Sequence, residues 1–428
     1  GGKTESDPGE IEDNVTMAQE LIISISGMRG IIGENMFPET AAEYGAAFGT
    51  FLKRNQSGKR PVVAIGRDSR PSGSMIFCAV ASGLASVGVD VIDLGICTTP
   101  GVGVMLRHLQ CSGGVVITAS HNPLPYNGIK FLLGNGIAPP KPMAETIRGL
   151  YFDKQFGRVN SVDCGKVRAN EGAAAVHLEK VLSIINPSQI AAKQFKVVLD
   201  SVNGAGGPVG LELLDKLGCT VTPVNTEPTG LFAHGAEPTE QNLVSLSEQV
   251  RQAKADIGFA QDPDADRLAL VDEKGRYIGE EFTLALVARY MFDRNPGGAA
   301  AANLSTSRMI DDIAATAGGR VIRTPVGEAN VAEAMVKNNC MIGGEGNGGV
   351  IDLRVGPIRD SLVGMAMILH LMAQTGQSLS QLADAVGGYA MYKTKYTANG
   401  EQAARIIEKA RRIYPDAQVN TSDGCRFD

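Results

Sequence analysis

Apolar runs of strand length alternate with stretches of helical spacing along most of the chain. In order, the predicted elements are a strand at 61–65, a helix at 75–87, a strand at 89–94, a helix at 101–109, strands at 113–117 and 195–200, helices at 208–217 and 307–318, a strand at 320–324 and a helix at 328–337. Strands that alternate with helices are typical of βαβ units and mostly parallel sheets. Because the scheme occurs three times, it predicts three related α/β domains with mostly parallel mixed sheets.

The last segment follows another pattern. Residues 389–396 alternate like an edge strand, and residues 401–414 have the spacing of an amphipathic helix. A strand, a helix and a turn cannot bury a core alone, so an incomplete α+β fourth domain is predicted. The predicted boundaries are a flexible leader at 1–20, a first domain at 21–165, a second at 166–280, a third at 281–388 and the partial fourth at 389–428.

Composition excludes several classes of protein. The 428 residues are 43% hydrophobic and carry 40 Lys and Arg against 46 Asp and Glu, so the basic stripe of a nucleic-acid binder is not expected. No apolar run approaches the roughly 20 residues that span a bilayer, and the polar, acidic start does not read as a secretory signal. The seven cysteines are scattered and never form a CxxC pair, which favours a reducing, cytoplasmic compartment.

Three aspartates alternate in the stretch DPDADR at 262–267. Asp262, Asp264 and Asp266 would repel one another unless a cation neutralised them, and carboxylate oxygens suit Mg²⁺ or Ca²⁺. An EF-hand loop is rejected, because Arg267 stands where that turn needs glycine and the chain continues as a strand. A solvated acidic turn is the alternative. Apolar runs on both sides favour the metal site.

A second polar cluster, TASHNP at 118–123, follows the predicted strand at 113–117. Ser120 and His121 together suggest hydrolase chemistry, yet adjacent side chains rarely face each other and no G-x-S-x-G elbow is present. A phosphorylated Ser120 near the aspartates would give a Mg²⁺ ion a fourth ligand and take part in phosphoryl transfer. The alternative is a helix N-cap at Ser120 before Pro123, and both can hold because an N-cap position also favours phosphate.

A glycine-rich stretch at 343–349 contains one carboxylate, Glu345, and one amide, Asn347. A backbone without Cβ atoms can approach a ligand closely. The carboxylate and the amide suit sugar hydroxyls as hydrogen-bond partners. A flexible turn is an equal alternative. Basic candidates for phosphate binding lie beside glycines near the ends of strand-like runs: Arg29, Arg67, Arg70 and Lys130. For each of them a surface ion pair is the plainer explanation.

Four stretches in order, SGMRG, TASHNPLPYNGIK, DPDADR and GEGNGG, resemble the α-D-phosphohexomutase family from about position 21 to the end. The resemblance implies four domains around a central cleft. It implies a phosphoserine at Ser120 and one Mg²⁺ per chain held by that phosphate with Asp262, Asp264 and Asp266. It further implies catalytic residues Arg29, His121 and Lys130, of which Lys130 is a candidate proton carrier. The implied substrate-binding residues are Arg267, Gly327, Glu345 and Asn347.

The implied activity is that of an isomerase that interconverts hexose or hexosamine 6-phosphate and 1-phosphate through a 1,6-bisphosphate. Asn347 and Gly349 replace the Ser and His of the family's GE-x-S-G-H pattern. This form resembles an archaeal-like subgroup assigned variously to phosphoglucosamine, glucose and mannose substrates. Phosphoglucosamine mutase is favoured slightly over phosphoglucomutase/phosphomannomutase. The expected partner is a phosphosugar, without nucleic acid or membrane, and the chain is expected to be a monomer or homodimer.

Two rival activities remain at this stage. A phosphatase would need an Asp nucleophile in D-x-D-G-T, which the stretch Ala265-Asp266-Arg267 does not supply. A catalytically silent sugar-phosphate binder is favoured by one departure from the family. The Ser/Thr/Arg-rich loop with which the family's fourth domain grips the distal phosphate is not found before Asp428, so poor turnover is expected of this chain alone.

Overall fold

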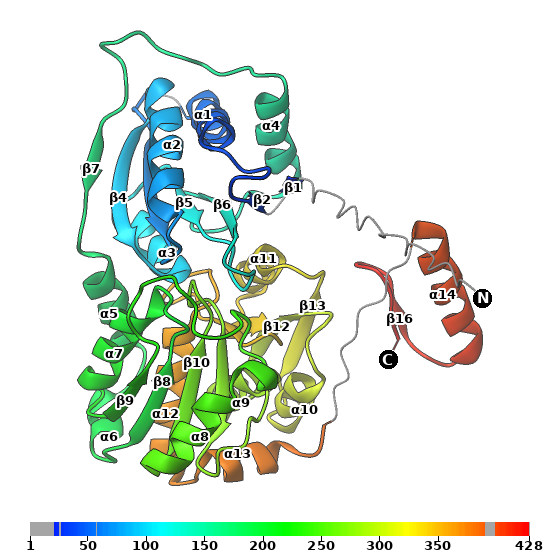
Figure 1. Cartoon of the computed structure of the whole chain (residues 1–428). Helices are drawn as coiled ribbons and strands as arrows, with labels where there is room; N and C mark the ends of the chain where they lie inside the picture. The colour runs from blue at the N-terminus through cyan, green and yellow to red at the C-terminus, as the bar shows by residue number, and fades with distance from the viewer. Residues whose placement is uncertain (1–20, 25–26, 57, 390–398, 428) are drawn as a thin grey trace, which may run out of the picture.

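The computed structural model describes residues 21–24, 27–56, 58–389 and 399–427, and it contains three α/β units followed by a short C-terminal segment (Figure 1). The first unit consists of β1 Ile22–Ser24, β2 Gly27–Ile31, α1 Pro38–Asn55, β3 Val62–Arg67, α2 Gly73–Ser86, β4 Asp90–Ile96, α3 Thr99–His108, β5 Gly113–Ile117, β6 Tyr126–Leu133, α4 Lys141–Phe152 and β7 Val167–Ala169. Because β7 pairs with β4, the first sheet extends past the predicted boundary at 165.

The second unit consists of α5 Ala173–Ser183, α6 Pro187–Ala191, β8 Lys196–Asp200, α7 Gly206–Lys216, β9 Thr220–Val224, the 3₁₀ turn Glu240–Asn242, α8 Val244–Ala253, β10 Ile257–Gln261 and β11 Leu268–Asp272. The third unit consists of α9 Glu281–Arg294, β12 Ala299–Asn303, α10 Met309–Thr316, β13 Arg320–Thr324, α11 Glu328–Asn338, β14 Ile342–Glu345, β15 Gly349–Ile351, α12 Ser361–Thr375 and α13 Leu379–Val386.

The three units repeat one sheet topology. The central strands are ordered β6-β5-β3-β4 in the first unit, β11-β10-β8-β9 in the second and β15-β14-β12-β13 in the third. In each set of four, the first three strands in chain order are parallel and the fourth returns antiparallel beside the third. Three related α/β units with mixed sheets, as the sequence predicts, are therefore confirmed.

The polar clusters occupy equivalent places in this topology. TASHNP lies in the connection from β5 to β6, DPDADR in the connection from β10 to β11, and Gly346 to Gly348 in the connection from β14 to β15. Each connection starts at the carboxyl end of a buried parallel strand, which is the edge where such sheets bind ligands. The same connection therefore occurs in all three units, and it carries different polar side chains in each.

Helix α12 joins the second and third units into one core. Every residue from Ser361 to Ala373 is buried, and the helix is apolar all round, as a helix enclosed by other elements must be. Its side chains belong to the same hydrophobic cluster as Leu199 and Phe259 of the second sheet and Ala300 and Ile342 of the third. The first unit has mainly its own clusters, so it is the more separate body.

Most predicted elements occur close to their predicted bounds. The strands at 113–117 and 320–324 coincide with β5 and β13, and both are rich in β-branched residues, which favour strands. The C-terminal helix is α14 Gly400–Ile413, and it precedes the hairpin of β16 Val419–Asn420 and β17 Arg426–Phe427. Most of the strand predicted at 389–396 lies outside the described residues.

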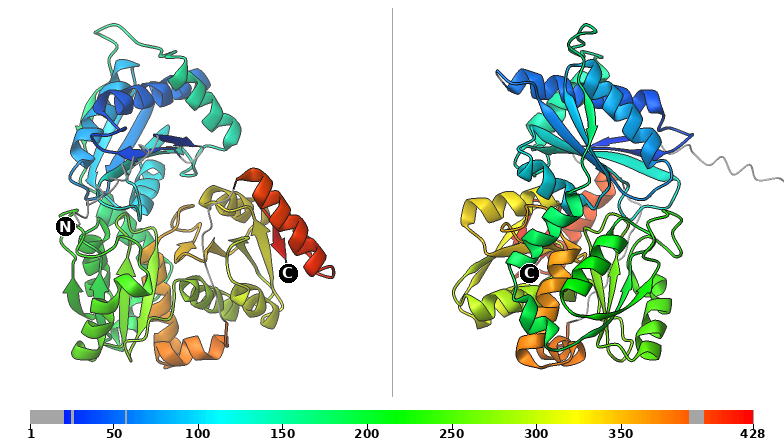
Figure 2. Two further views of the ribbon diagram at one scale, coloured as in Figure 1. Left: turned by 45° about the vertical axis from the view of Figure 1, so that its right-hand side comes forward. Right: turned by 90° about the vertical axis from the view of Figure 1, so that its left-hand side faces the viewer.

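The C-terminal segment lies against the third unit (Figure 2). The Asp423 carboxylate accepts a hydrogen bond from the amide of Val326 at 2.7 Å, and Arg426 donates to the Leu304 carbonyl at 2.8 Å. Helix α14 itself has no buried residue, and its apolar Ile406 and Ile413 are exposed. The segment thus touches the third unit through its hairpin.

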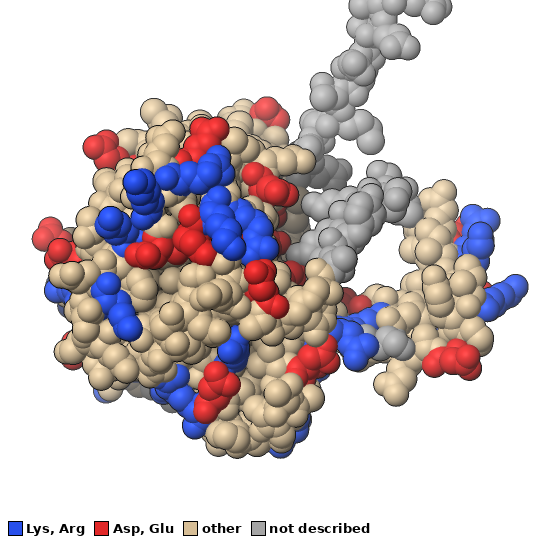
Figure 3. All heavy atoms as spheres, turned by 90° about the horizontal axis from the view of Figure 1, so that it is seen from below, with Lys and Arg blue, Asp and Glu red and all other residues tan. Residues whose placement is uncertain are grey.

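Surface charge is mixed. Lys and Arg side chains lie interspersed with Asp and Glu over the face seen from below (Figure 3). Among the described residues, no helix has both the length and the apolarity to cross a membrane. Each of the seven cysteines carries a free thiol.

One buried histidine ties the shared helix to its neighbours. The Tyr290 hydroxyl of α9 donates to His370 Nδ1 at 2.8 Å, and His370 Nε2 donates to Gln189 of α6, also at 2.8 Å. Because Gln189 Oε1 can only accept, Nε2 carries a proton, and in the neutral imidazole Nδ1 then accepts from Tyr290. Burial, assisted by the Arg294 guanidinium, lowers the pKa of His370 to about 4.

We expect this histidine to make the fold sensitive to acid. Its pKa lies below that of the unfolded chain, so the unfolded chain binds more protons in this range and stability falls as the pH drops from about 6.5 toward 4.5. Urea unfolding measured across this range should show a smaller fall for His370→Gln than for the wild type. Parallel pH profiles for the two proteins would contradict the assignment.

Candidate active site

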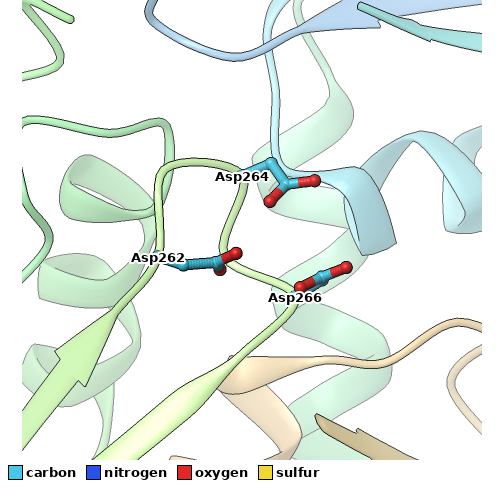
Figure 4. Close-up of side chains that lie close together, drawn as sticks. All are labelled: Asp262, Asp264 and Asp266. Atoms are coloured by element: carbon cyan, nitrogen blue, oxygen red, sulfur yellow. The ribbon is translucent and has the colours of Figure 1, made fainter. Parts of the chain in front are cut away.

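The three aspartates lie together in the turn between β10 and β11. Asp262, Asp264 and Asp266 are almost completely buried, and their candidate ligand oxygens all lie within 4.8 Å of one another. Figure 4 shows the three side chains leaving one turn toward the same side. The strand-like runs on both flanks, which the sequence placed at the edge of a core, are β10 and β11.

The turn is closed by its own backbone. The Asp262 carbonyl accepts from the amide of Ala265, and Asp262 Oδ1 accepts from the amide of Arg267 at 3.1 Å. Ala265 takes a left-handed φ of 58°, which costs an alanine about 1 kcal/mol. This conformation is part of the turn that directs the three carboxylates to one point.

Residues of the other two units hold these carboxylates. Asp264 Oδ2 accepts from the Thr99 hydroxyl at 2.6 Å and from Lys130 Nζ at 3.2 Å, both in the first unit. Asp266 Oδ2 accepts from Arg359 Nη2 of the third unit at 2.5 Å. The second oxygen of both groups, Oδ1, is buried without a hydrogen-bond partner among the described residues. In both Asp264 and Asp266, Oδ2 is therefore hydrogen-bonded, while Oδ1 has no hydrogen-bond partner among the described residues.

These residues fit a divalent cation. The donor set is all oxygen, and the two Oδ1 atoms without partners are the kind of ligand that a hard cation takes. Burial and the charges of Asp264 and Asp266 raise the pKa of Asp262 well above its ordinary value. Burial would also raise the pKa of Asp264, but Lys130 and the Thr99 hydroxyl outweigh it and lower that pKa. A cation beside Asp262 would oppose this rise and favour its ionised form.

Ser120 lies at the metal-binding turn. Its side chain is 3% exposed, and its hydroxyl donates to Asp262 Oδ2 at 3.2 Å. The Nδ1 atom of His121 is 3.4 Å from the same hydroxyl, and burial followed by the charge of Arg267 lowers the pKa of His121 to about 4. The structure thus brings Ser120 and Asp262 together across 142 positions of sequence.

The helix N-cap interpretation of Ser120 is wrong. Residues 121–125 form turns that lead directly into strand β6, and Ser120 has a left-handed φ of 48°. Its amide donates to the Thr118 hydroxyl, which bends the chain back toward the sheet. Pro123 lies within the connection between β5 and β6 and does not begin a helix.

Arg70 holds the serine loop in place. Its guanidinium donates to the carbonyls of Ser120, Asn122, Pro123 and Tyr126 at 2.7–2.9 Å and to the Asp68 carboxylate at 3.1 Å. All its donors are therefore used by the protein. Arg67 pairs with Asp93 at 3.0 Å. Arg70 therefore has no N–H left for a phosphate, while Arg67 forms the ion pair that was its plainer explanation.

The other predicted basic residues lie around the same site. Arg29 donates to the side chain of Asn122, two positions after Ser120, at 3.1 Å. Arg267 contacts Glu237 at 3.3 Å, while its Nε, 3.9 Å from Asp266 Oδ1, is buried without a hydrogen bond. Burial would lower the pKa of Lys130, but Asp264 reverses the effect and raises it. Lys130 is therefore a protonated group with its side chain one-quarter exposed.

The glycine-rich connection of the third unit is ordered by internal bonds. Glu345 Oε1 accepts from Asn303 Nδ2 at 2.7 Å and from the Gly327 amide at 3.1 Å, and Oε2 accepts from Arg359 Nη1. Asn347 is different, because its Oδ1 is buried without a hydrogen-bond partner among the described residues. Asn347 therefore offers an acceptor, while the Glu345 carboxylate is already engaged.

A glycine docks this connection on the metal-binding turn. The Gly348 carbonyl accepts from the amide of Leu268, the first residue of β11, at 3.0 Å. Gly348 has a φ of 86°, and a Cβ there would lie 2.4 Å from the Leu268 carbonyl oxygen. Only glycine permits this approach of two backbones.

Two functional candidates were missed by sequence reasoning. Thr99 begins helix α3 and bonds Asp264 through its backbone amide as well as its hydroxyl. Arg359 precedes helix α12 and joins Asp266 to Glu345. The only local signal was the polar run Arg359-Asp360-Ser361 before a long apolar helix, which indicates a helix start and not a catalytic group.

We expect Arg70→Lys to destabilise the fold by about 3 kcal/mol, because it leaves buried carbonyls without donors. The free energy of unfolding in urea would measure this. Arg67→Lys is a matched control with a part-exposed partner, and it should cost less than about 1 kcal/mol. Equal losses for both variants would show that Arg70 does not hold the serine loop.

Comparison with known families agrees with this arrangement. Family models described as phosphoglucomutase/phosphomannomutase alpha/beta/alpha domain I, II and III match residues 21–158, 175–275 and 280–389. Together they cover the three α/β units.

Individual proteins show the same likeness. A phosphoglucomutase/phosphomannomutase of Thermococcus kodakarensis is 41% identical over 94% of this chain and 88% of its own length. A "probable phosphoglucosamine mutase" of Methanopyrus kandleri is 34% identical over 94% of this chain and 88% of its own length. The crystal structure of a phosphoglucomutase/phosphomannomutase family protein from Burkholderia thailandensis superposes with a TM-score of 0.81 at 28% identity, covering 95% of this chain and 89% of that one.

Proposed function

The chain belongs to the α-D-phosphohexomutase family, whose members are isomerase-class phosphotransferases, and we propose that it works through a phosphorylated Ser120 and a metal ion in the Asp262–Asp266 turn. One observation carries the proposal. The Ser120 hydroxyl lies 3.2 Å from Asp262 Oδ2, so a phosphate on that hydroxyl would lie beside the unpartnered oxygens of Asp264 and Asp266.

The proposed roles follow from the positions of the side chains. Ser120 would give its phosphoryl group to a sugar hydroxyl and take one back from the other end of the resulting hexose 1,6-bisphosphate. Asp262, Asp264 and Asp266 would hold Mg²⁺ together with the phosphate on Ser120. The ion, when bound, supplies positive charge that stabilises the transferring phosphoryl group.

Surrounding groups of this chain would orient the reactants. Lys130, one-quarter exposed beside Asp264, is the proposed proton carrier for the sugar hydroxyl. Arg29 and His121 lie beside the Ser120 loop, and Arg267 lies beside Asp266. All three are proposed to act on the phosphoryl group or the substrate.

The proposed substrate is a hexosamine or hexose phosphate. Asn347 Oδ1 supports it, because a buried acceptor without a partner suits an ammonium or hydroxyl donor on a sugar ring. Phosphoglucosamine mutase activity remains the first proposal. Phosphoglucomutase/phosphomannomutase activity is the second, because a relative of 41% identity carries that name. We expect a monomer or homodimer that acts in the cytoplasm.

Label transfer tests the proposal. The chain is incubated with hexose 1,6-bisphosphate labelled in its phosphates and with Mg²⁺, and then digested. We expect label on the Ser120 peptide, and we expect unlabelled glucosamine 6-phosphate or glucose 6-phosphate to remove it. The sugar that removes the label faster identifies the preferred substrate.

Ser120→Ala is the control for label transfer. It removes the acceptor oxygen, so both labelling and isomerisation should vanish. Labelling or turnover near the wild-type rate in this variant would refute the phosphoserine. Sugar-phosphate binding by the wild type without any labelling would support the silent binder instead.

Asp264→Asn tests the metal site. The amide keeps the shape of the side chain but removes a charge, so Mg²⁺ affinity should fall about tenfold or more. Calorimetric titration with Mg²⁺ would measure the change. Asp256→Asn serves as the matched control, because Asp256 only accepts from the Lys196 amide at 2.8 Å, and its Mg²⁺ titration should match the wild type. Unchanged affinity in Asp264→Asn would make the carboxylates structural.

A further inference from the structure

Arg359 contacts both the metal-binding turn and the sugar-binding connection. It is 8% exposed, its Nη2 donates to Asp266 Oδ2, and its Nη1 donates to Glu345 Oε2, each at 2.5 Å. Its Nε and its backbone amide both donate to Glu328 Oε2, at 3.1 and 2.9 Å. One guanidinium therefore joins three carboxylates from two units of the fold.

The neighbours of Arg359 fix its position. Asp360 caps helix α12 and bonds His177 at 2.6 Å. The Ser361 amide donates to the Ala265 carbonyl at 3.2 Å, and the Ser361 hydroxyl accepts from Gln261 at 2.8 Å. The segment is thus tied to the residues on both sides of Asp262.

The stem of Arg359 has little room to move. It passes over Gly349, where an added Cβ would lie 2.1 Å from Arg359 Cδ. Glycine at 349 therefore makes space for this arginine.

We propose that Arg359 is a positioning residue that sets the orientation of Asp266 and Glu345 together, so that metal binding and sugar binding depend on one guanidinium. The inference rests on the proposed function, since it assigns the metal to the aspartates and the sugar to the third unit. Arg359 acts through the two carboxylates and not on the reacting atoms.

The geometry explains why an arginine is needed. Its two Nη groups diverge in one plane, so each holds a separate carboxylate at a fixed angle. The guanidinium donates to Asp266 Oδ2, so Oδ1 of the same carboxylate stays available to a cation. A lysine carries the same charge on a single atom, so it cannot fix both carboxylates.

Arg359→Lys is therefore the first test, because it keeps the charge and changes only the geometry. We expect Mg²⁺ affinity, measured by calorimetry without sugar, to fall about tenfold or more. We expect the affinity for glucosamine 6-phosphate or glucose 6-phosphate, measured without metal, to fall about tenfold as well. Binding of both probes within twofold of the wild type would overturn the proposal.

Arg354→Lys is the matched control. Arg354 lies in the same segment and pairs with Asp352 at 2.5 Å, but it contacts neither Asp266 nor Glu345. This variant should bind both probes like the wild type. If it lost affinity as Arg359→Lys does, the effect would belong to the segment and not to Arg359.

Glu328→Gln separates positioning from anchoring. It weakens only the third contact of Arg359, so both binding constants should stay within about threefold of the wild type while Arg359 still reaches Asp266 and Glu345. Losses equal to those of Arg359→Lys would show that Arg359 merely anchors helix α11, and would refute the proposal.

A double-mutant cycle tests directly whether Arg359 couples the two carboxylates. Glu345→Gln should weaken Mg²⁺ binding about threefold or more, because Arg359 then loses the charged partner that holds Nη1, and Nη2 holds Asp266 less firmly. In the Arg359→Lys background the same change should shift Mg²⁺ affinity less than about twofold. An equal shift in both backgrounds would mean direct electrostatics between Glu345 and the ion, and would overturn the inference.

Failure of the proposed function would look different. In that case the wild type would not be labelled on Ser120, whatever the binding cycle showed. The cycle measures only the binding of Mg²⁺ and of a sugar phosphate. It therefore tests the positioning role of Arg359 independently of turnover.

Discussion

Burying three carboxylates in one turn is the constraint on which the rest of the structure depends. Asp262, Asp264 and Asp266 have no contact with bulk water, and an uncompensated buried charge is among the most unfavourable features a fold can contain. Their own unit offers mainly backbone amides. The balancing donors are Thr99 and Lys130 of the first unit and Arg359 of the third. The site is therefore stable only when all three units are assembled around it.

The repeated topology makes that assembly possible. In each unit the fourth strand of the central set returns antiparallel beside the third, and the connection between them lies at the carboxyl edge of the sheet. This connection holds Ser120 in the first unit, the three aspartates in the second and Asn347 in the third. Equivalent positions in three copies of one topology thus carry a hydroxyl, carboxylates and an amide.

The sequence alone predicted several strands and helices and located the polar residues of each connection, but it did not predict α1, β6 or α12. Apolar runs such as 113–117 define strands directly, and alternating carboxylates at 262–266 have few uses besides metal binding. Partners across the fold could not be predicted. Thr99 and Asp264 are separated by 165 positions, and Arg359 and Asp266 by 93. Local patterns also misled, because Pro123 after Ser120 resembles a helix start unless β6 is known to return beside β5.

Helix α12 has a consequence for how a substrate could enter. Because its side chains are enclosed by the second and third sheets alike, these two units form one rigid body, and Asp266 and Asn347 keep their separation. The first unit touches that body at the site through polar contacts such as Ser120 with Asp262 and Lys130 with Asp264. Val104 of α3 nevertheless belongs to the same apolar cluster as α12, so apolar packing also holds the first unit to that body. A movement that separates Ser120 from Asp262 therefore also exposes apolar surface, at a cost in free energy that grows with the area exposed.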